Sequence, residues 1–414
     1  APLENMNVSI EGPGNWGTCT DQNGYYSIDF VPYGDWRVQV APSGGNWCGG
    51  PESYATEYWQ ESPTSGDATT LTLDTGTPSR SGIDFTLKPA FKLGILAPFS
   101  GSNAWVGEEF YNAALMAFDA INWELGPYQI VPVQIDSQSD PTLAAQAYED
   151  AILNEGIQAG VLNWHSSVAV DVMEVAAQYQ IPHFFGLGAT ETVNQNFNAD
   201  PSYYGYWTSK GWPVPDKLDV AYVQALEDAI SRGLWNPAEK TVAIYVEQGS
   251  GFGNSIKTHF LDAGWTVVAE ETFPDGQTDF YTILNQFKTL NPAVVAGDNW
   301  DVDSAAALLQ QAEEVGLESQ IITYGLGWLG DWYSTVGDAS NYVLDMYPDW
   351  VTADGLTFAA DFETQYGYAP ETYAGGLGYD GINFFVALAQ AALTEYGDIN
   401  SATLFQFAQN QLWT

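Results

Sequence analysis

The sequence contains very few basic residues. Lysine and arginine together number 10 of 414 residues, against 52 aspartates and glutamates, so the formal net charge is −42 at pH 7. A surface this negative repels the phosphates of nucleic acids and of anionic lipids, and nucleic-acid binding is therefore excluded. The same charge keeps a protein soluble and suits an extracellular, a salty or an acidic habitat.

Residues that support catalysis or metal binding are also scarce. The histidines are His165, His183 and His259. No HExxH, GxSxG or Cys/His pattern surrounds them, so we predict no enzyme activity, no metal site and no cofactor. Gly249–Gly253 lies between a predicted strand and a predicted helix, but it lacks the glycine spacing of a dinucleotide loop. Asp298, Asp301 and Asp303 lack the glycine that an EF-hand loop needs.

The cysteines, Cys19 and Cys48, both lie in the first 50 residues. In an exported protein this arrangement indicates a disulfide that closes a small domain, worth roughly 3–4 kcal/mol on the chain-entropy model. Two unrelated buried thiols are the alternative. No apolar run reaches the length of about 20 residues that spans a bilayer. A chain of 414 residues is expected to form two or three domains.

Residues 1–89 are rich in glycine, proline, serine and threonine and show no helical periodicity. Short alternating runs separated by turns predict a small antiparallel β-sandwich. These runs are MNVSIEG (6–12), GYYSIDFVP (24–32), WRVQVAP (36–42), TTLTLDT (69–75) and SGIDFTL (81–87).

The segment CTDQNGYYSIDFVPYGDWRVQV, residues 19–40, resembles the carboxypeptidase-regulatory-like (transthyretin-type) module. The shared features are a Thr-Asp-x-x-Gly-x-Tyr turn, a Pro-x-Gly and an aromatic-x-Val-x-Val strand. The resemblance implies an accessory module of a secreted or surface protein, without chemistry of its own. The family begins with one more strand than precedes Pro2, so we expect upstream residues or another chain to supply it.

From residue 92 onward, predicted strands and helices alternate. One series runs through the helices 108–122, 141–155 and 167–179, and a second through the helices 217–232, 253–263, 278–289 and 302–315. A Trp/Pro-rich break at 206–216 separates them. Two such βαβ series predict two doubly wound α/β lobes with parallel sheets.

This region resembles the type I periplasmic solute-binding proteins that bind branched-chain amino acids and amides. The resemblance lies in the order of KLGILAPFSGSNAWVGEEFYNAALMAFDAIN, QIDSQSDPTLAAQAYEDAI, VLNWHSSVAVDVMEVAAQYQIPHFFGLGAT and VAIYVEQGSGFGNSIKTHFLDAGWTVVAEETF. It implies two lobes that clamp a solute, with one formed by 92–211 plus about 345–414 and the other by 212–344. The family continues with further strands after a helix such as 402–412, so the domain 92–414 is expected to lack its final strands.

Trp164-His165-Ser166-Ser167 lies where a strand ends and a helix begins. Hydroxyls beside the backbone N–H groups of a helix N-terminus suit a carboxylate ligand. Alternatively, Ser166 or Ser167 is simply the N-cap. The resemblance favours a ligand role for Ser166 or Ser167.

The resemblance implies further ligand contacts. Ala189 and Thr190 correspond to a pair that holds the ligand carboxylate, although such a pair also caps helices. Trp105 lies in the loop that reaches over the ligand, or is a packing residue. The remaining candidates, in the second lobe, are Phe252, Asp298 and Trp300.

Amino-acid binders of this family carry an acidic residue after the strand that corresponds to QIITYG, where it neutralises the ligand ammonium. This sequence has Gly325-Leu326-Gly327 there. A buried ammonium without a counter-charge is costly. Either Asp298, Asp301 or Asp331 substitutes, or the solute is not an α-amino acid.

The first hypothesis is thus a non-enzymatic, extracellular or cell-surface solute-binding protein that delivers a small molecule to the membrane permease of an ABC transporter. The second is a surface-layer or filament subunit that self-associates through unpaired terminal strands. A sensory ectodomain is the third.

Overall fold

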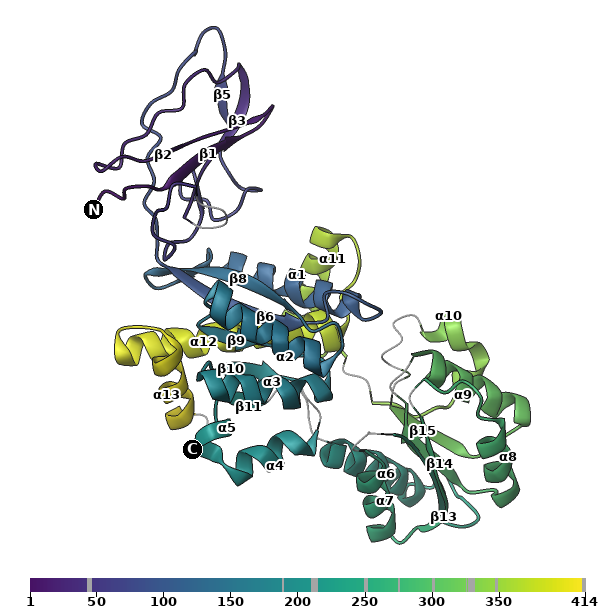
Figure 1. Cartoon of the computed structure of the whole chain (residues 1–414). Coiled ribbons are helices and arrows are strands. Elements are labelled where there is room, and N and C mark those ends of the chain that lie inside the picture. Colours follow the sequence, from purple (N-terminus) through teal and green to yellow (C-terminus); the bar gives the residue numbers. More distant parts are fainter. Residues whose placement is uncertain are drawn as a thin grey trace.

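The computed structural model describes residues 1–42, 47–187, 190–209, 215–248, 252–274, 276–299, 302–324, 326, 332–346 and 349–411. Within these residues the strands form three sheets, one in the N-terminal part and two in the rest of the chain (Figure 1). We call the six-stranded sheet with its helices lobe one, and the four-stranded sheet with its helices lobe two.

The N-terminal sheet is antiparallel, as predicted. Its strands run in the order β2-β1-β3-β4, and β5 pairs with β3. The bounds are β1 Asn7–Glu11, β2 Asn15–Cys19, β3 Gly34–Ala41, β4 Glu57–Tyr58 and β5 Leu71–Leu73. Alternate residues of β1 and β3 face one core, which comprises Met6, Val8, Ile10, Trp36, Val38, Val40 and Leu71.

Two of the predicted strands, 24–32 and 81–87, are not strands in the structure, and β2 was not predicted. Their apolar residues do alternate and rest half-buried on the core, which explains the pattern in the sequence. The two segments are linked through a side chain, because the hydroxyl of Tyr26 donates to the carbonyl oxygen of Ile83 at 2.6 Å. The second layer of the expected sandwich therefore consists of segments that pack on the core without the backbone pairing of a β-sheet.

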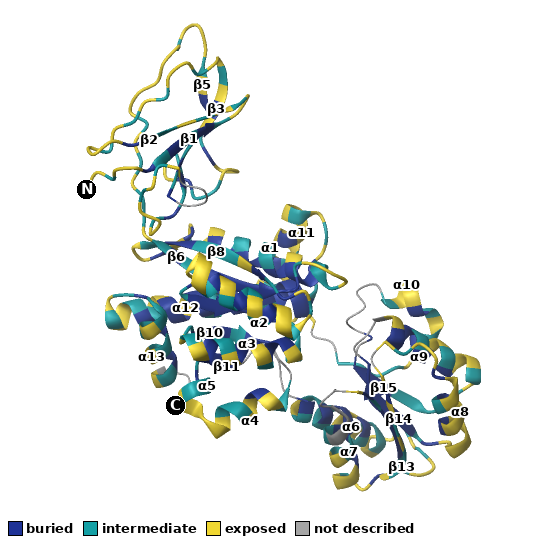
Figure 2. Ribbon diagram, viewed as in Figure 1, coloured by how far each residue is buried: buried dark blue, intermediate teal, exposed yellow. Residues whose placement is uncertain are grey.

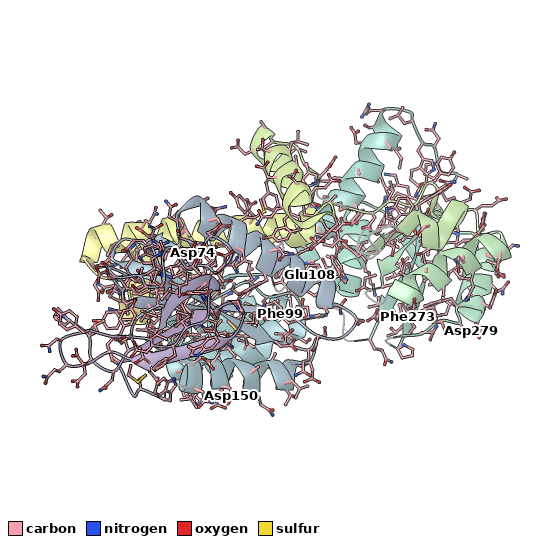
Figure 3. All side chains as sticks on the ribbon, turned by 90° about the horizontal axis from the view of Figure 1, so that it is seen from above. Asp74, Phe99, Glu108, Asp150, Phe273 and Asp279 are labelled. Carbon is pink, nitrogen blue, oxygen red and sulfur yellow. A yellow bond between two sulfur atoms is a disulfide. The ribbon has the colours of Figure 1, made fainter. Side chains whose placement is uncertain are left out.

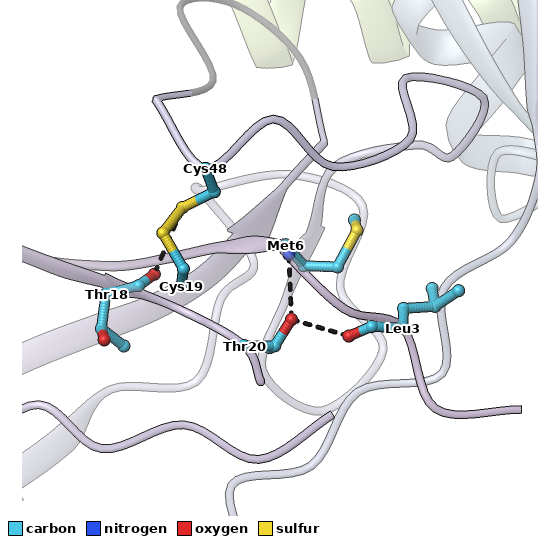
Figure 4. The surroundings of a disulfide bond; sticks show 6 residues. All are labelled: Leu3, Met6, Thr18, Cys19, Thr20 and Cys48. Atoms are coloured by element: carbon cyan, nitrogen blue, oxygen red, sulfur yellow. Dashed lines mark hydrogen bonds between the residues drawn. A yellow bond between two sulfur atoms is a disulfide. The ribbon is translucent and has the colours of Figure 1, made fainter. Parts of the chain in front are cut away.

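Cys19 and Cys48 form the predicted disulfide, with their Cα atoms 5.6 Å apart. The bond ties the end of β2 to the connection that follows β3 (Figure 4). Beside it, the hydroxyl of Thr20 accepts from the backbone N–H of Met6 at 2.9 Å and donates to the carbonyl oxygen of Leu3 at 2.6 Å. These bonds hold the start of the chain against the sheet.

Lobe one contains a parallel sheet in the order β11-β10-β9-β6-β8, with β7 added antiparallel to β8. Its strands are β6 Ala90–Ala97, β7 Glu124–Leu125, β8 Tyr128–Asp136, β9 Ala159–Val161, β10 His183–Gly186 and β11 Trp207–Ser209. Its helices before the second lobe are α1 Ala104–Ala120, α2 Pro141–Asp150 with the π-helical η1 Ala151–Glu155, α3 Ser166–Tyr179, α4 Glu191–Ala199 and α5 Pro201–Tyr204.

Both faces of this sheet are covered by helices, and its central strand β6 is buried from Leu93 to Ala97, where every residue is apolar (Figure 2). Leu93 and Ile95 belong to the core under α1. Leu96 points to the other face, where α2 and α3 pack. This alternation is the two-residue period expected for a strand.

Lobe two contains the parallel sheet β13-β12-β14-β15. The strands are β12 Thr241–Glu247, β13 Thr266–Phe273, β14 Val294–Asp298 and β15 Gln320–Tyr324. The helices are α6 Pro215–Ser231, α7 Phe252–Asp262, α8 Tyr281–Leu290, α9 Val302–Val315, α10 Trp332–Val336 and the 3₁₀ turn η3 Gly337–Ser340. Helices α6 and α7 share one core with the sheet, and α8 and α9 share the other.

After lobe two the chain returns to lobe one (Figure 1). The returning elements are α11 Ala353–Tyr366, the π-helical η4 Thr372–Gly376, α12 Leu377–Tyr396 and α13 Ser401–Gln411. Phe385 and Ala389 of α12 lie in the same core as Phe110 and Phe118 of α1. None of the helices described has the length and apolar character needed to cross a lipid bilayer.

Candidate functional site

Lobe one and lobe two each direct the carboxyl ends of their parallel strands toward loops that carry polar side chains. Seen from above, Phe99 and Glu108 lie at the end of lobe one that is nearer to lobe two, to which Phe273 and Asp279 belong (Figure 3).

The loop after β6 is held by the carboxylate of Asp136, the last residue of β8. Asp136 Oδ1 accepts from the backbone N–H groups of Phe99, at 2.8 Å, and Ser100, at 3.2 Å, and Oδ2 accepts from the hydroxyl of Ser100 at 2.6 Å. Partial burial disfavours the charged form, but these hydrogen bonds outweigh it and lower the pKa of Asp136. The loop is therefore fixed in place by an ionised carboxylate.

The N-cap residue of α3 makes no hydrogen bond from its side chain to the helix. This residue is His165, in an extended conformation, and Ser166 and Ser167 are the first two residues of the helix. The alternative interpretation, that one of the serines is the N-cap, therefore does not apply in the structure. An N-terminus that carries two serines and whose N-cap side chain makes no capping bond keeps the geometry that suits an anion.

His165 lies in a cluster of neutral polar groups. Its Nε2 is 3.4 Å from Nδ2 of Asn103, which also donates to the hydroxyl of Ser139 at 3.3 Å. Asn163 Nδ2 donates to the carbonyl oxygen of His165 at 3.0 Å. Burial lowers the pKa of His165 to about 4, so the imidazole is neutral at pH 7.

Two polar atoms of this cluster are buried without a hydrogen-bond partner in the described part of the chain: Asn163 Oδ1 and His165 Nδ1. Leaving such atoms unsatisfied costs about 1–3 kcal/mol each, which a bound polar group would recover. Sequence reasoning gave no role to Asn103, Ser139, Asn163 or His165. All four follow the carboxyl end of a strand, and that position was the available signal.

Trp105 is the second residue of α1 and is part of an aromatic wall, which we define as Trp105, Trp164 and Tyr373. The ring centroids are 6.4 Å apart for Trp105 and Trp164, and 6.0 Å apart for each of them and Tyr373. Both tryptophans are half-buried, whereas Tyr373 is fully buried. Trp105 thus packs on the core and also keeps an accessible surface.

Thr190 is the N-cap of α4, and its Oγ1 accepts from the backbone N–H of Thr192 at 3.2 Å. The capping interpretation therefore holds for Thr190. A hydroxyl that accepts one hydrogen bond still has its own proton to donate, so capping leaves room for a ligand carboxylate. Ala189 lies outside the described residues.

In lobe two, Asp298 is the last residue of β14 and is fully buried. Its Oδ1 accepts from the backbone N–H of Glu247 at 3.3 Å, which joins the ends of β12 and β14. Phe252 begins α7, but its side chain lies outside the described part of the chain. The other candidates of this lobe, Trp300, Asp301 and Asp331, are not among the described residues either.

A second buried acid, Asp219 of α6, was not predicted. Tyr324, the last residue of β15, donates its hydroxyl to Asp219 Oδ1. Burial raises the pKa of Asp219 to about 6, although the hydrogen bond from Tyr324 opposes this effect. Close by, the hydroxyl of Tyr222 donates to Asp345 Oδ1 at 2.9 Å and accepts from the N–H of Met346 at 2.6 Å.

A surface groove of about 1070 Å³ lies at the opposite edge of lobe two. Its lining includes Thr241 and Gln320, the first residues of β12 and β15, together with Trp235 and Tyr342. Ligands of open parallel sheets bind at the carboxyl ends of the strands, and this groove is at the amino ends. We therefore do not assign the groove to the solute site.

Residues 90–410 match the sequence profile of a family described as periplasmic binding protein. The chain belongs to this family. The Leu/Ile/Val-binding protein homolog 8 of Brucella abortus is 27% identical over 243 residues, which cover 57% of this chain and 58% of that protein. The chain thus spans somewhat more than half of the length of the curated relatives that it matches.

Solved structures of periplasmic binding proteins share the fold. LivJ from Streptococcus pneumoniae in complex with isoleucine has a TM-score of 0.62 at 20% identity, covering 77% of this chain and 87% of that one. A solute-binding protein of Rhodopseudomonas palustris in complex with 3,4-dihydroxybenzoic acid has a TM-score of 0.62 at 19% identity, covering 76% and 84%. The two-lobed α/β fold with parallel sheets is thereby confirmed, and the relatives are solute-binding proteins of ABC transporters, not enzymes.

Proposed function

We propose that this periplasmic binding protein is exported and clamps a small carboxylate-bearing solute between lobe one and lobe two. The observation that carries the proposal is the N-terminus of α3, where Ser166 and Ser167 follow His165 and the side chain of this N-cap residue makes no capping bond. This N-terminus supplies N–H groups, hydroxyls and a partial positive charge to an anion. Closure of the lobes by a hinge motion would then present the solute to a membrane permease.

The remaining predicted residues complete this proposal. Thr190 and Ala189 would hold the same carboxylate, and Trp105 would cover the solute from lobe one. Phe252, Asp298 and Trp300 would contact it from lobe two. We further propose that residues 1–89 form a carboxypeptidase-regulatory-like module, which spaces the solute-binding part (92–414) from the cell surface.

The carboxylate of Asp298 is fully buried and bonded to the backbone of β12, so it is poorly placed to neutralise a ligand ammonium. We therefore expect carboxylates without an ammonium group to bind at least as well as amino acids. The relatives that were solved with isoleucine and with 3,4-dihydroxybenzoic acid make both classes reasonable probes.

Calorimetric titration with isoleucine, leucine, benzoate and 3,4-dihydroxybenzoate tests the proposal. We expect at least one of them to bind, and we expect the double variant Ser166→Ala, Ser167→Ala to weaken that binding about tenfold or more, since each lost hydrogen bond to a charged group is worth roughly 1.5–3 kcal/mol. Thr364→Ala is the control, because this exposed hydroxyl of α11 donates only to Ala360 of its own helix at 2.8 Å. If none of the four probes binds, the proposal is wrong.

A second candidate function, self-association, is favoured by the segments 24–32 and 81–87. Both carry alternating apolar residues, and neither pairs as a strand in the structure. Such segments accept a strand from a neighbouring chain. Light scattering after size-exclusion chromatography tests self-association directly. A monomer at all concentrations would rule it out, and an oligomer that dissociates in the variant Ile28→Pro would support it.

A further inference from the structure

Glu109 is a carboxyl group buried inside lobe one. It lies on α1 with a relative exposure of 4%, and it takes part in none of the ion pairs found among the described residues. Burying an unpaired carboxyl group is costly, so its presence calls for a compensating interaction. That interaction is with the backbone of a segment more than 260 residues further along the chain.

The compensating bonds come from the segment that contains η4. Glu109 Oε2 accepts from the N–H of Glu371 and from the N–H of Gly375, both at 2.9 Å. The approach is close, because a Cβ atom on Gly375 would lie 3.1 Å from Glu109 Oε2 and 2.8 Å from the Cβ of Pro370. One carboxyl oxygen thus holds the residue that precedes η4 and the fourth of its five buried residues against α1.

This turn supplies the third ring of the aromatic wall. Tyr373 lies between the two residues that Glu109 holds, and its ring meets that of Trp105 at 88° and that of Trp164 at 33°. Trp105 and Glu109 are one helical turn apart, so they lie on the same side of α1. The position of Tyr373 behind both tryptophans therefore depends on the bonds to Glu109.

We propose that Glu109 is a positioning residue of the solute site: it holds Tyr373 behind Trp105 and Trp164, and thereby fixes the surface that the two tryptophans present to the solute. That this wall belongs to the solute site rests on the proposed function. The geometry of the wall does not. Glu109 itself does not touch the solute.

The role requires an acceptor oxygen and not a negative charge. Burial is the largest influence on Glu109 and raises its pKa to about 7, with the neighbouring Glu371 and Glu108 acting in the same direction. The neutral form is thus well populated near pH 7. Glutamine keeps one acceptor oxygen of the same reach, and one oxygen already serves both bonds.

Three variants test the proposal: Glu109→Gln, Glu109→Leu, and Glu108→Gln as the exposed neighbour on the same helix. The first measurement needs no ligand. For each protein, near-ultraviolet circular dichroism is recorded with and without the additional substitution Trp164→Phe. The difference between the two spectra reports how strongly the Trp164 ring is coupled to its neighbouring rings. We expect this difference to be retained in Glu109→Gln and Glu108→Gln and to fall by half or more in Glu109→Leu.

The second measurement is the affinity for whichever of isoleucine, leucine, benzoate and 3,4-dihydroxybenzoate the wild type binds. Glu109→Leu should weaken it about tenfold, and Glu109→Gln by less than about twofold. Ile157→Ala is the control for loss of stability, because Ile157 is buried on the other face of the sheet and does not contact the aromatic wall. It should alter neither the spectral difference nor the affinity.

A spectral difference that survives in Glu109→Leu would overturn the proposal, as would an equal loss in Glu109→Gln and Glu109→Leu. If none of the four probes binds the wild type, the proposed function fails, but the spectral measurement still decides the role of Glu109. The two failures are therefore distinguishable.

Discussion

The carboxyl edges of the two sheets occupy equivalent positions in lobe one and lobe two, yet they are built from different chemistry. The edge of lobe one carries the neutral groups Asn103, Asn163 and His165 beside the tryptophans of the aromatic wall. Its ionised carboxylate, Asp136, is already bonded to the loop after β6. The edge of lobe two carries the buried acids Asp219 and Asp298. A carboxylate solute therefore finds neutral hydrogen-bond donors on the first surface, whereas the two acids of the second offer it no positive partner.

From this difference we expect the two lobes to contribute unequally to solute binding. Lobe one supplies a helix N-terminus and neutral donors, so it should capture the solute before the lobes close. The acids of lobe two already have partners of their own, the hydroxyl of Tyr324 and the N–H of Glu247.

Removing a ring from the wall should have the largest effect. Trp164→Ala loses contacts with Trp105, Phe110 and Tyr373, which should cost about 4 kcal/mol of stability and weaken solute binding about thirtyfold or more. Trp235→Ala, at the amino edge of lobe two, is the matched control and should leave the affinity unchanged. Equal losses of affinity in both variants would show that lobe one contributes no more to solute binding than lobe two.

The stability of lobe one should fall on acidification because of His165. Its pKa in the folded state is about 4, below the usual 6.5, so only the unfolded state takes up a proton as the pH falls through 6.5 toward 4. His165→Gln should therefore remove up to about 3 kcal/mol of acid destabilisation, measured by urea unfolding at pH 7 and pH 4.5. His183, with a pKa of about 3, still contributes in the variant, so the acid sensitivity should shrink without disappearing. An unchanged pH dependence would contradict the burial of a neutral His165.

Asp219 should give lobe two the opposite pH dependence. Its pKa is raised from 3.8 to about 6, so the folded state is penalised for ionisation as the pH rises through this range, by about 3 kcal/mol above it. Asp219→Asn keeps the acceptor for Tyr324 and should raise the free energy of unfolding at pH 7 by a similar amount. The gain should vanish near pH 3.5, and a gain that persists there would exclude this explanation.

The smallest expected effect distinguishes a capping role of Thr190 from a role in solute binding. Thr190→Ala and Thr352→Ala each remove the side-chain N-cap of a helix, α4 or α11, and each should cost about 1 kcal/mol of stability. We expect the Thr190 variant alone to weaken solute binding, because Thr190 lies at the carboxyl edge of lobe one. Equal affinities in the two variants would leave Thr190 with a capping role only.

Much of the lobe architecture could be predicted, because buried parallel strands such as β6 and β12 each contain a continuous run of five apolar residues, LGILA and VAIYV, and the helices of the lobes have regular periodicity. The prediction started α1 at residue 108, but the helix begins at Ala104, because the small residues before it resembled a loop. Strand β11, Trp207–Ser209, was interpreted as part of a Trp/Pro-rich break, because three residues carry no periodic signal.

The parts of the site that could not be predicted depend on contacts distant in sequence. Tyr373 meets Trp105 only after the chain has returned from lobe two, and Asp219 meets Tyr324 across more than 100 residues. In residues 24–32 the alternation correctly indicated an inward-facing side, but alternation reports burial and does not report whether the backbone has a partner. The roles predicted for Ser166, Ser167, Thr190 and Asp298 stay predictions.

The return of the chain to lobe one also dictates an order of events during biosynthesis. Lobe two, from α6 to η3, is continuous in sequence and can fold as soon as it emerges, whereas α1 exposes Phe110 and Phe118 until α12 has been made. In the nascent chain this apolar face of α1 therefore stays uncovered while the whole of lobe two is synthesised. Closing contacts of such long range is slow. The strong negative charge of the chain, formally −42 in all, would keep such an unfinished protein from aggregating.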